Sequence, residues 1–206
     1  MLVTMMPQIF EFDSKRLLWK QCIKRHARKV IKQSDDYEID IGVRRDTVFG
    51  DSFEQLKDLT PAQWLQKFSV EFHGEEGVDE GGLTKEWFQL VSKGVFDPNY
   101  ALFKQSGNGS AYFPDPISHI FSPGETVQYF EFVGRIIGKA LAEGQLLDCY
   151  FVKALYKMML GQTIVLKDLE DFDEQLYRSL IYMLKHDAEM LCQVFVLSSQ
   201  VFDKDQ

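Results

Sequence analysis

The stretch FHGEEGVDEGGLTKEW, residues 72–87, carries the most information about the fold, because a strand pattern changes there into a helix pattern. Apolar and polar residues alternate over 68–72, which predicts a short strand. Apolar residues then recur at helical spacing over 83–93, and Gly94 is the expected end of that helix. The glycines within the stretch permit a sharp reversal, so the sequence predicts a strand, a tight turn and a helix in succession.

Four carboxylates, Glu75, Glu76, Asp79 and Glu80, stand among these glycines and allow two interpretations. Carboxylates in a glycine-rich loop can bind a metal ion, but the D-x-[DN]-x-[DN]-G spacing of calcium loops is absent. Acidic groups just before a helix also interact favourably with its positive end. We therefore expect the acids to stabilise the helix, and we expect no metal site.

The sequence on either side predicts further helices and strands. An amphipathic basic helix is expected over 14–31, a strand over 39–43 and the strongest helix over 126–143. Shorter helices are expected over 47–59, from Thr60-Pro61 onward, over 151–160 and over 173–185, the last with Asp173 as its cap. The Pro- and Gly-rich segment 97–125 is expected to form loops with short strand pieces. The predicted fold class is α+β, mainly helical.

Composition and charge limit the class of protein to which the chain can belong. With 45% hydrophobic and 26% charged residues, the chain has the balance of a packed globular protein. No stretch approaches the roughly 20 apolar residues that span a bilayer, so we expect no membrane span and a cytoplasmic or nuclear location. The net charge is −8, yet residues 1–32 carry eight Lys/Arg against two acids. This basic end either complements the acidic remainder of its own domain, which we favour, or contacts a phosphate-bearing partner.

Sequence motifs of self-contained catalysis are missing. The four histidines, His26, His73, His119 and His186, form no HExxH or other close pair, and neither G-x-S-x-G nor a P-loop occurs. Cys22, Cys149 and Cys192 are far apart and form no CxxC pair, so we expect neither disulfides nor zinc. The residues alone therefore indicate an interaction domain without a cofactor.

Several motifs in fixed order nevertheless resemble one family, the HECT ubiquitin ligases. Residues 72–87 are similar to the family's F-x-G-E-x-G-x-D-x-G-G-x-x-x-E-[WF] signature, and VRRD (43–46) and DSF (51–53) precede it as in the family. DPNYALF (97–103), YF-x-FVGRI (129–136), LLD (146–148) and YK-x-x-LG (156–161) then follow in family order.

The resemblance implies a domain organisation. The family fold has a larger, mostly helical amino-terminal lobe and a smaller carboxy-terminal lobe joined by a hinge. By that likeness, residues 1–36 form a basic helix and link, 37–172 the main body of the first lobe, and 173–206 the start of a conjugating-enzyme-binding subdomain. The family's L-P-x-x-x-T-C segment, whose thiol accepts ubiquitin, is absent here. The resemblance thus implies no catalytic residue in this chain, although the parent protein would be an enzyme.

The family binds ubiquitin-charged conjugating enzyme in an apolar groove, and the matching positions here are Leu176, Leu180, His186, Leu191 and Val194. The spacing of Leu176 and Leu180 by itself is equally typical of core residues on a helix. His186 also departs from the aromatic or apolar residue that some members carry. The assignment of these five residues to a docking groove therefore rests on the resemblance.

A second family site, present in some members, binds ubiquitin non-covalently, and it corresponds to Tyr100 and Leu102. The function implied is part of a ubiquitin-protein transferase, with conjugating enzyme and ubiquitin as partners and substrates selected by regions outside this chain. Two alternatives are a truncated binding module that acts as a decoy for conjugating enzyme or ubiquitin, and a purely structural domain. No nucleic acid partner is expected.

Overall fold

The computed structural model describes residues 9–31, 38–75, 81–107, 109, 111–121, 123–148 and 150–186. The chain divides into two compact units, each built from two stretches of sequence. Unit 1 comprises Met1–Val95 and Val127–Asp148, and unit 2 comprises Phe96–Thr126 and Cys149–Gln206. The described residues are mainly helical with two small sheets, which confirms the predicted fold class. The boundaries proposed at residues 36 and 172 stay predictions.

Unit 1 is organised around two parallel strands. β1 (Ile39–Val43) pairs with β2 (Phe68–Phe72) in a register that places Ile41 opposite Val70. Both strands occur at the predicted residues, because their alternating side chains turn one apolar set into the core. The connection between them contains α3 (Val48–Leu56) and the 3-10 turn η2 (Gln63–Leu65).

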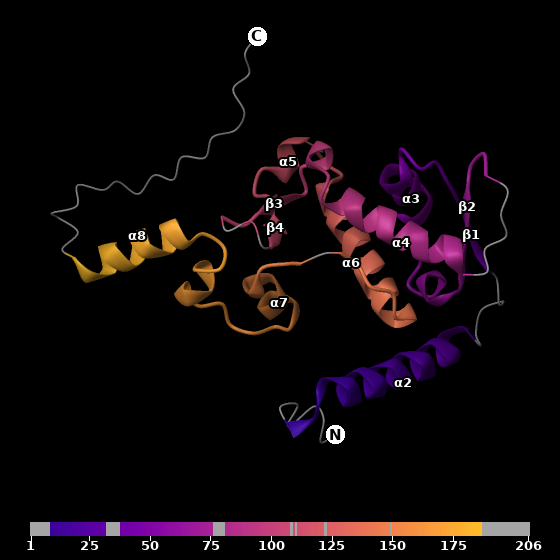
Figure 1. Cartoon of the computed structure of the whole chain (residues 1–206), viewed down its shortest axis with the longest axis horizontal. Coiled ribbons are helices and arrows are strands. Elements are labelled where there is room, and N and C mark those ends of the chain that lie inside the picture. Colours follow the sequence, from indigo (N-terminus) through magenta and orange to yellow (C-terminus); the bar gives the residue numbers. More distant parts are fainter. Residues whose placement is uncertain are drawn as a thin grey trace, which may run out of the picture. The chain divides into compact units, whose positions relative to one another are not determined.

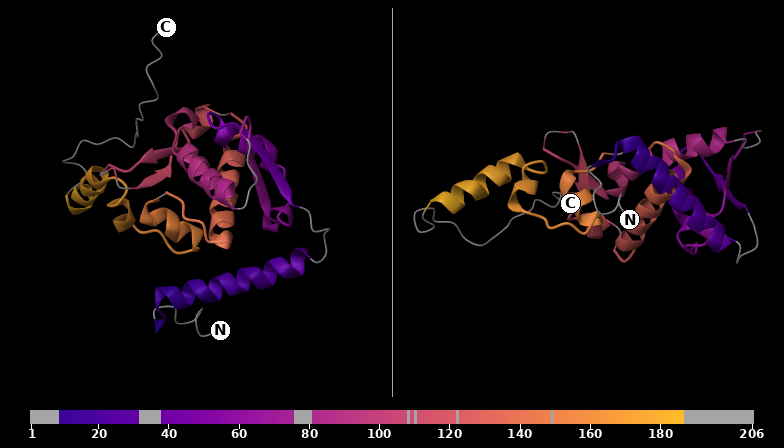
Figure 2. Two further views of the ribbon diagram at one scale, coloured as in Figure 1. Left: turned by 45° about the vertical axis from the view of Figure 1, so that its right-hand side comes forward. Right: turned by 90° about the horizontal axis from the view of Figure 1, so that it is seen from below.

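Helices α4 (Gly82–Val95) and α6 (Thr126–Glu143) complete the core of unit 1. Both lie on one side of the β1–β2 pair (Figures 1 and 2). The helices bury one face each, as their 3.6-residue periodicity predicts. The largest buried side chains of this core are Trp87, Phe53, Phe68, Phe72, Phe88 and Phe132.

Gly94 does not end α4, contrary to the sequence-based expectation, since the helix continues to Val95. A Cβ atom at Gly94 would lie 2.5 Å from the Cβ atom of Phe49 in α3. The glycine is therefore required by the close approach of two helices. Sequence alone does not separate these roles, because a glycine near a helix end fits both.

The helix expected from Thr60-Pro61 onward is only the 3-10 turn η2. The side-chain oxygen of Gln63 accepts hydrogen bonds from the Thr60 backbone N–H at 2.9 Å and from its hydroxyl at 2.8 Å. Such local side-chain bonds compete with a regular helix. The extended backbone of Gln66 then leads directly into β2.

The basic helix α2 (Phe12–Ile31) forms over the expected residues. Ile23, Ala27 and Val30 are half-buried and lie on one side of it. Its one ion pair among the described residues joins Arg16 to Asp13 within the helix itself. In the described part of the chain, α2 therefore forms no ion pair with the acidic remainder, although the sequence predicts that their charges complement each other.

Unit 2 begins with an antiparallel pair, β3 (Phe103–Gln105) and β4 (Tyr112–Pro114), followed by the short α5 (Ser118–Phe121). Tyr112 also exchanges hydrogen bonds with the segment before α7 (Lys153–Met159), accepting from Val152 and donating to Tyr150. An aromatic cluster covers this junction. Its rings, with centroids 4.0–5.8 Å apart, belong to Phe96, Phe103, Tyr112 and Phe151.

Candidate functional site

Helix α8 (Glu174–Lys185) carries Leu176 and Leu180, two of the residues that the resemblance assigns to the conjugating-enzyme groove. Asp173 caps the helix, and its side chain accepts a hydrogen bond from the Leu176 N–H at 2.9 Å. Such a cap satisfies one of the free donors of the first turn. Asp173 was predicted as the cap, and the structure confirms it.

Leu176 and Leu180 are both half-buried, and none of the residues of α8 is fully buried. Because they are four residues apart, their side chains lie on the same side of the helix. Leu184 continues that stripe one turn further on and is 73% exposed. α8 therefore presents an apolar stripe that ends in an open leucine.

His186 lies away from this stripe. Its ring stacks on Tyr182 with centroids 3.8 Å apart, and its Nδ1 atom lies 2.8 Å from the Tyr182 carbonyl oxygen. Tyr182 is two residues beyond Leu180, which places it on the other side of a helix with 3.6 residues per turn. The structure therefore brings together the two leucines but not His186. Leu191 and Val194 lie outside the described residues.

The base of α8 is fixed within unit 2 by the segment before it. The ring of Phe172 packs on that of Phe113 with centroids 3.8 Å apart, and the carbonyl oxygen of Phe172 accepts a hydrogen bond from the Gly107 N–H. In the 3-10 turn η4 (Leu166–Leu169), Asp168 forms an ion pair of 2.6 Å with Lys157 of α7. This pair lowers the pKa of the Asp168 carboxyl. The helix thus starts from a defined support.

Tyr100 and Leu102, the predicted ubiquitin-binding residues, differ in exposure. Tyr100 is half-buried at the end of the 3-10 turn η3 (Pro98–Tyr100), which Asp97 caps by accepting from the Asn99 N–H at 2.9 Å. Leu102 is 1% exposed, so in this conformation only Tyr100 offers surface. Ala101 between them adopts a φ of 47°, an uncommon conformation for a residue with a side chain.

Arg45 joins the two ends of the glycine-rich stretch, a role that sequence periodicity does not reveal. Its guanidinium forms ion pairs with Glu75 near the start of the stretch and with Glu86 near its end in α4, the latter at 2.6 Å. It also lies 4.3 Å from the ring centroid of Phe72. Both carboxylates raise the pKa of Arg45. Glu76, Asp79 and Glu80 lie outside the described residues. Within the described ranges, no group of three or more His, Cys, Asp or Glu side chains is placed to hold a metal ion.

Two further motif residues, Asp51 and Ser52, tie α3 to its neighbours. Asp51 accepts from the backbone and side chain of Arg44 and from the Thr47 hydroxyl. Ser52 accepts from the buried indole N–H of Trp87 at 2.8 Å. The family-like motifs 43–46, 51–53 and 85–87 are therefore linked in space by side-chain bonds.

The hydrogen bonds from Arg44 hold the pKa of the Asp51 carboxyl well below its ordinary value. A carboxyl with a lowered folded-state pKa stabilises the fold above its unfolded-state pKa of about 4, and loses that contribution as the pH falls. We expect Asp51→Asn to lower the melting temperature at pH 7 and to flatten its decline below about pH 4. Thermal unfolding followed by circular dichroism from pH 2 to pH 7 measures both effects.

Asp58→Asn is the matched control, because Asp58 is exposed and makes no hydrogen bond or ion pair with the described residues. It should leave the melting curve at each pH nearly unchanged. An Asp51→Asn curve that runs parallel to the wild-type curve over the whole pH range would contradict the assignment.

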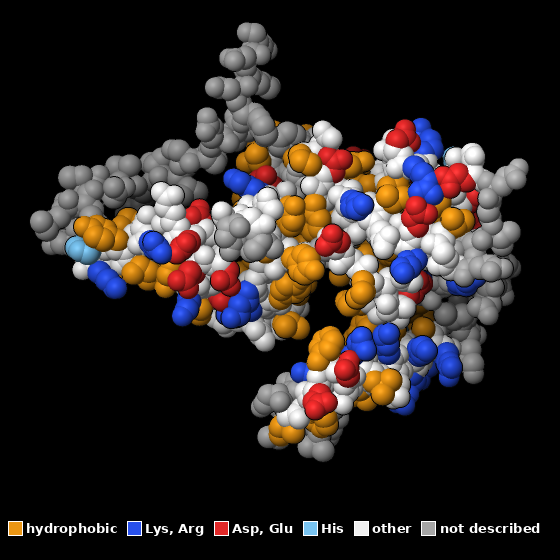
Figure 3. Space-filling model, in the orientation of Figure 1, with side chains coloured by type: hydrophobic (Ala, Val, Ile, Leu, Met, Phe, Trp, Pro, Cys, Tyr) orange, Lys and Arg blue, Asp and Glu red, His pale blue; other side chains and the backbone are white. Residues whose placement is uncertain are grey.

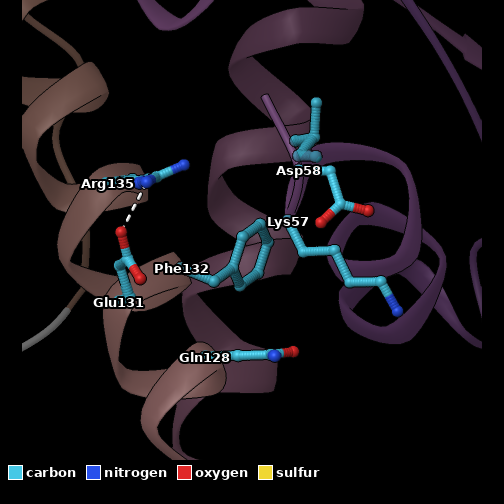
Figure 4. Close-up of a pocket in the computed structure, with 7 residues that line it drawn as sticks. Lys57, Asp58, Gln128, Glu131, Phe132 and Arg135 are labelled. Carbon is cyan, nitrogen blue, oxygen red and sulfur yellow. Dashed lines mark hydrogen bonds and ion pairs between the residues drawn. The ribbon is translucent and has the colours of Figure 1, made fainter. Parts of the chain in front are cut away.

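A separate hollow of about 200 Å³ lies between the end of α3 and α6. Figure 4 shows Lys57 and Asp58 on one side of it and Gln128, Glu131 and Arg135 on the other. Arg135 pairs with Glu131 and donates to the Leu59 carbonyl at 2.8 Å. Since its lining mixes both charges and Arg135 is already paired, the hollow indicates no particular ligand chemistry.

No described helix has the length and apolar character that a membrane crossing requires.

Similarity to known proteins bears on the family of this chain. A family model described as HECT-domain (ubiquitin-transferase) matches residues 89–206. The chain is 41% identical over 200 residues to the E3 ubiquitin-protein ligase TOM1-like of Neurospora crassa, and 36% identical over 195 residues to the E3 ubiquitin-protein ligase HUWE1 of Mus musculus. It is 39% identical over 180 residues to the E3 ubiquitin-protein ligase Nedd-4 of Drosophila melanogaster.

These matches cover 95%, 94% and 87% of this chain, but only 5%, 4% and 18% of the respective relatives. The chain therefore spans a small part of the length of the proteins that it resembles. The family model covers more than half of the chain, and the relatives are named as E3 ubiquitin-protein ligases. The chain belongs to the HECT-domain family of ubiquitin ligases.

Proposed function

We propose that this chain provides the surface on which a HECT ubiquitin ligase docks its ubiquitin-charged conjugating enzyme, and that the apolar stripe of α8 is part of that surface. The observation that carries the proposal is the partial exposure of this stripe, from the half-buried Leu176 and Leu180 to the open Leu184, on a capped helix with a fixed base. Apolar helix faces commonly lie in, or provide, the grooves of helix-mediated complexes. Leu176 and Leu180 are the proposed anchors, with His186, Leu191 and Val194 as further contacts.

The start of α8 adds negative charge to the proposed docking surface. Glu170, Asp171 and Glu174 line a hollow of about 310 Å³ at the start of the helix. A partner with lysine or arginine next to an apolar patch would complement both. Charge complementarity of this kind mainly raises the association rate, so we infer that docking weakens as salt increases.

We expect Leu180→Ala to weaken binding of conjugating enzyme about thirtyfold, since truncating a central apolar anchor typically costs ~2 kcal/mol. Calorimetric titration of a panel of ubiquitin-charged conjugating enzymes measures this loss. Lys185→Ala is the matched control, because Lys185 is exposed on the same helix but outside both the apolar stripe and the acidic hollow. Circular dichroism of each variant shows whether the chain remains folded.

The outcomes separate the interpretations. If Leu180→Ala unfolds the chain, Leu180 is a core residue and its assignment to the docking surface fails. If the variant is folded and binds as well as wild type, the docking surface lies elsewhere. Loss of binding in both Leu180→Ala and Lys185→Ala would show that α8 is disturbed as a whole.

We further propose that this chain docks the conjugating enzyme without itself accepting ubiquitin, because it contains no L-P-x-x-x-T-C segment. Transfer to substrate lysines would then need a cysteine-bearing lobe. The alternative function is a binding module that acts as a decoy for conjugating enzyme or ubiquitin. The titration samples, run on a non-reducing gel, should show no thiol-sensitive ubiquitin adduct. An adduct that disappears in Cys149→Ala or Cys192→Ala would identify a nucleophile in this chain.

We propose Tyr100 as the exposed part of a weak ubiquitin-binding surface. The proposal is supported by its half-buried ring at the end of a capped turn. Leu102, which is buried directly after that turn, belongs to the same proposed site as a residue that fixes the position of Tyr100. Protein substrates would bind to regions outside this chain.

A further inference from the structure

Helix α2 has two different sides. One side carries Ile23, Ala27 and Val30, which are half-buried. The opposite side combines two exposed leucines with four exposed cations. We call this second side the α2 outer face, and it consists of Leu17, Leu18, Lys24, Arg25, Arg28 and Lys29.

The spacing of these residues places them on one side of the helix. Lys24 and Arg28 follow Leu17 by seven and eleven residues, and Arg25 and Lys29 follow Leu18 by the same intervals. Intervals of seven and eleven residues return to the same side of an α-helix. The leucines therefore precede the cations along one continuous surface, which the helix of 20 residues extends over about 30 Å.

The four cations have no counter-ion in the described part of the chain. Every one of them is exposed, and none forms an ion pair or hydrogen bond with a described residue. Figure 3 shows the Lys and Arg side chains crowded along one half of α2, with apolar side chains toward the other half. Four adjacent like charges repel each other, so an external anion would relieve that repulsion.

The exposed leucines narrow the choice of anion. Leu17 is 61% exposed and Leu18 is 40% exposed. A nucleic acid backbone offers phosphates for the cations but no apolar surface for the leucines. A membrane with acidic lipids offers both, because leucines enter the acyl boundary while lysines and arginines contact the headgroups.

We propose that the α2 outer face binds the surface of a membrane that contains acidic phospholipids. The helix lies in the plane of the interface and does not span it. The acidic remainder of the chain does not prevent this contact, because charges more than about 8 Å from the surface are largely screened at physiological ionic strength. Such binding would concentrate a ubiquitin ligase on a membrane reversibly, through charge and two leucines.

The test is sedimentation of the whole chain with vesicles of phosphatidylcholine alone or of phosphatidylcholine mixed with the acidic lipid phosphatidylserine. We expect binding only to the acidic vesicles, with a loss on raising the salt concentration. The variant Lys24→Gln, Arg25→Gln, Arg28→Gln, Lys29→Gln should reduce the partition coefficient at least about a hundredfold, since each cation contributes roughly fivefold. Glutamine keeps the helix propensity similar.

A charge-matched control removes four exposed lysines elsewhere, in the variant Lys85→Gln, Lys93→Gln, Lys104→Gln, Lys153→Gln. It should bind acidic vesicles as wild type does. The variant Leu17→Ala, Leu18→Ala should bind several-fold less tightly. Circular dichroism of all variants confirms that α2 is still helical.

Three results would overturn the proposal. The first is equal sedimentation with neutral and acidic vesicles, or none with either. The second is an equal loss of binding in the α2 variant and in the charge-matched control. The third is salt-sensitive binding to a single-stranded or duplex oligonucleotide that exceeds vesicle binding and is unchanged by Leu17→Ala, Leu18→Ala, which would assign the face to nucleic acid instead.

Discussion

Replacing Phe53 with alanine is expected to lower the free energy of unfolding by about 3–5 kcal/mol, the usual range for a fully buried aromatic residue. Phe53 is 0% exposed. Its ring stacks on Tyr129 with centroids 3.9 Å apart and meets Phe132 edge-on at 5.6 Å. Truncation removes these contacts and leaves a cavity between α3 and α6. Urea denaturation followed by circular dichroism measures the loss.

Phe12→Ala is the matched control, because the same side chain is 72% exposed there. Its effect should stay within about 0.5 kcal/mol, as is usual for surface substitutions. Because both variants remove the same side chain, the difference between their unfolding free energies measures the effect of burial. Equal effects at both positions would contradict the description of the core.

The second large effect is expected at Gly94, where alanine should destabilise the chain by about 3 kcal/mol, the upper part of the range for overpacking. The added Cβ would lie 2.5 Å from the Phe49 Cβ and 3.0 Å from its Cγ. A Cβ atom cannot rotate away, so α3 and α4 would have to separate. Equilibrium unfolding in urea gives the difference from wild type.

Gly138 in α6 provides a control of opposite sign. A Cβ at Gly138 meets no atom within 4 Å, and the position is helical and exposed. Gly138→Ala should therefore stabilise the chain by roughly 0.5–1 kcal/mol through helix propensity and reduced unfolded-state entropy. A Gly94→Ala variant as stable as wild type would show that the helices are not in the close contact described.

Short-range patterns in the sequence predicted most elements of the fold. The alternation over 39–43 and 68–72 gave both strands of the β1–β2 pair, and Asp173 was recognised as the cap of α8. Such patterns depend on residues a few positions apart. The role of Gly94 could not be predicted in this way, because Phe49 approaches it from 45 residues earlier in the chain.

Sequence patterns predicted part of the candidate site. Helical periodicity placed Leu176 and Leu180 on one side of α8, and the structure agrees. The burial of Leu102 depends on its tertiary surroundings, where its carbonyl accepts from the Asp115 N–H, and periodicity carries no information about that contact. The ion pairs of Arg45 with Glu75 and Glu86 span 30 and 41 residues. Opposite charges in two family-like motifs were their only indication in the sequence.

Unit 1 is built from two stretches of chain that are separated by residues 96–126 of unit 2. During synthesis the ribosome releases α3, α4 and both strands well before α6. Until α6 emerges, Phe49 and Phe53 lack the rings of Tyr129 and Phe132 on which they pack. The nascent chain therefore exposes an unfinished aromatic cluster for the time needed to translate the intervening segment. Translation speed over 96–126 and chaperone access to that cluster should then influence how much of this protein reaches its folded state.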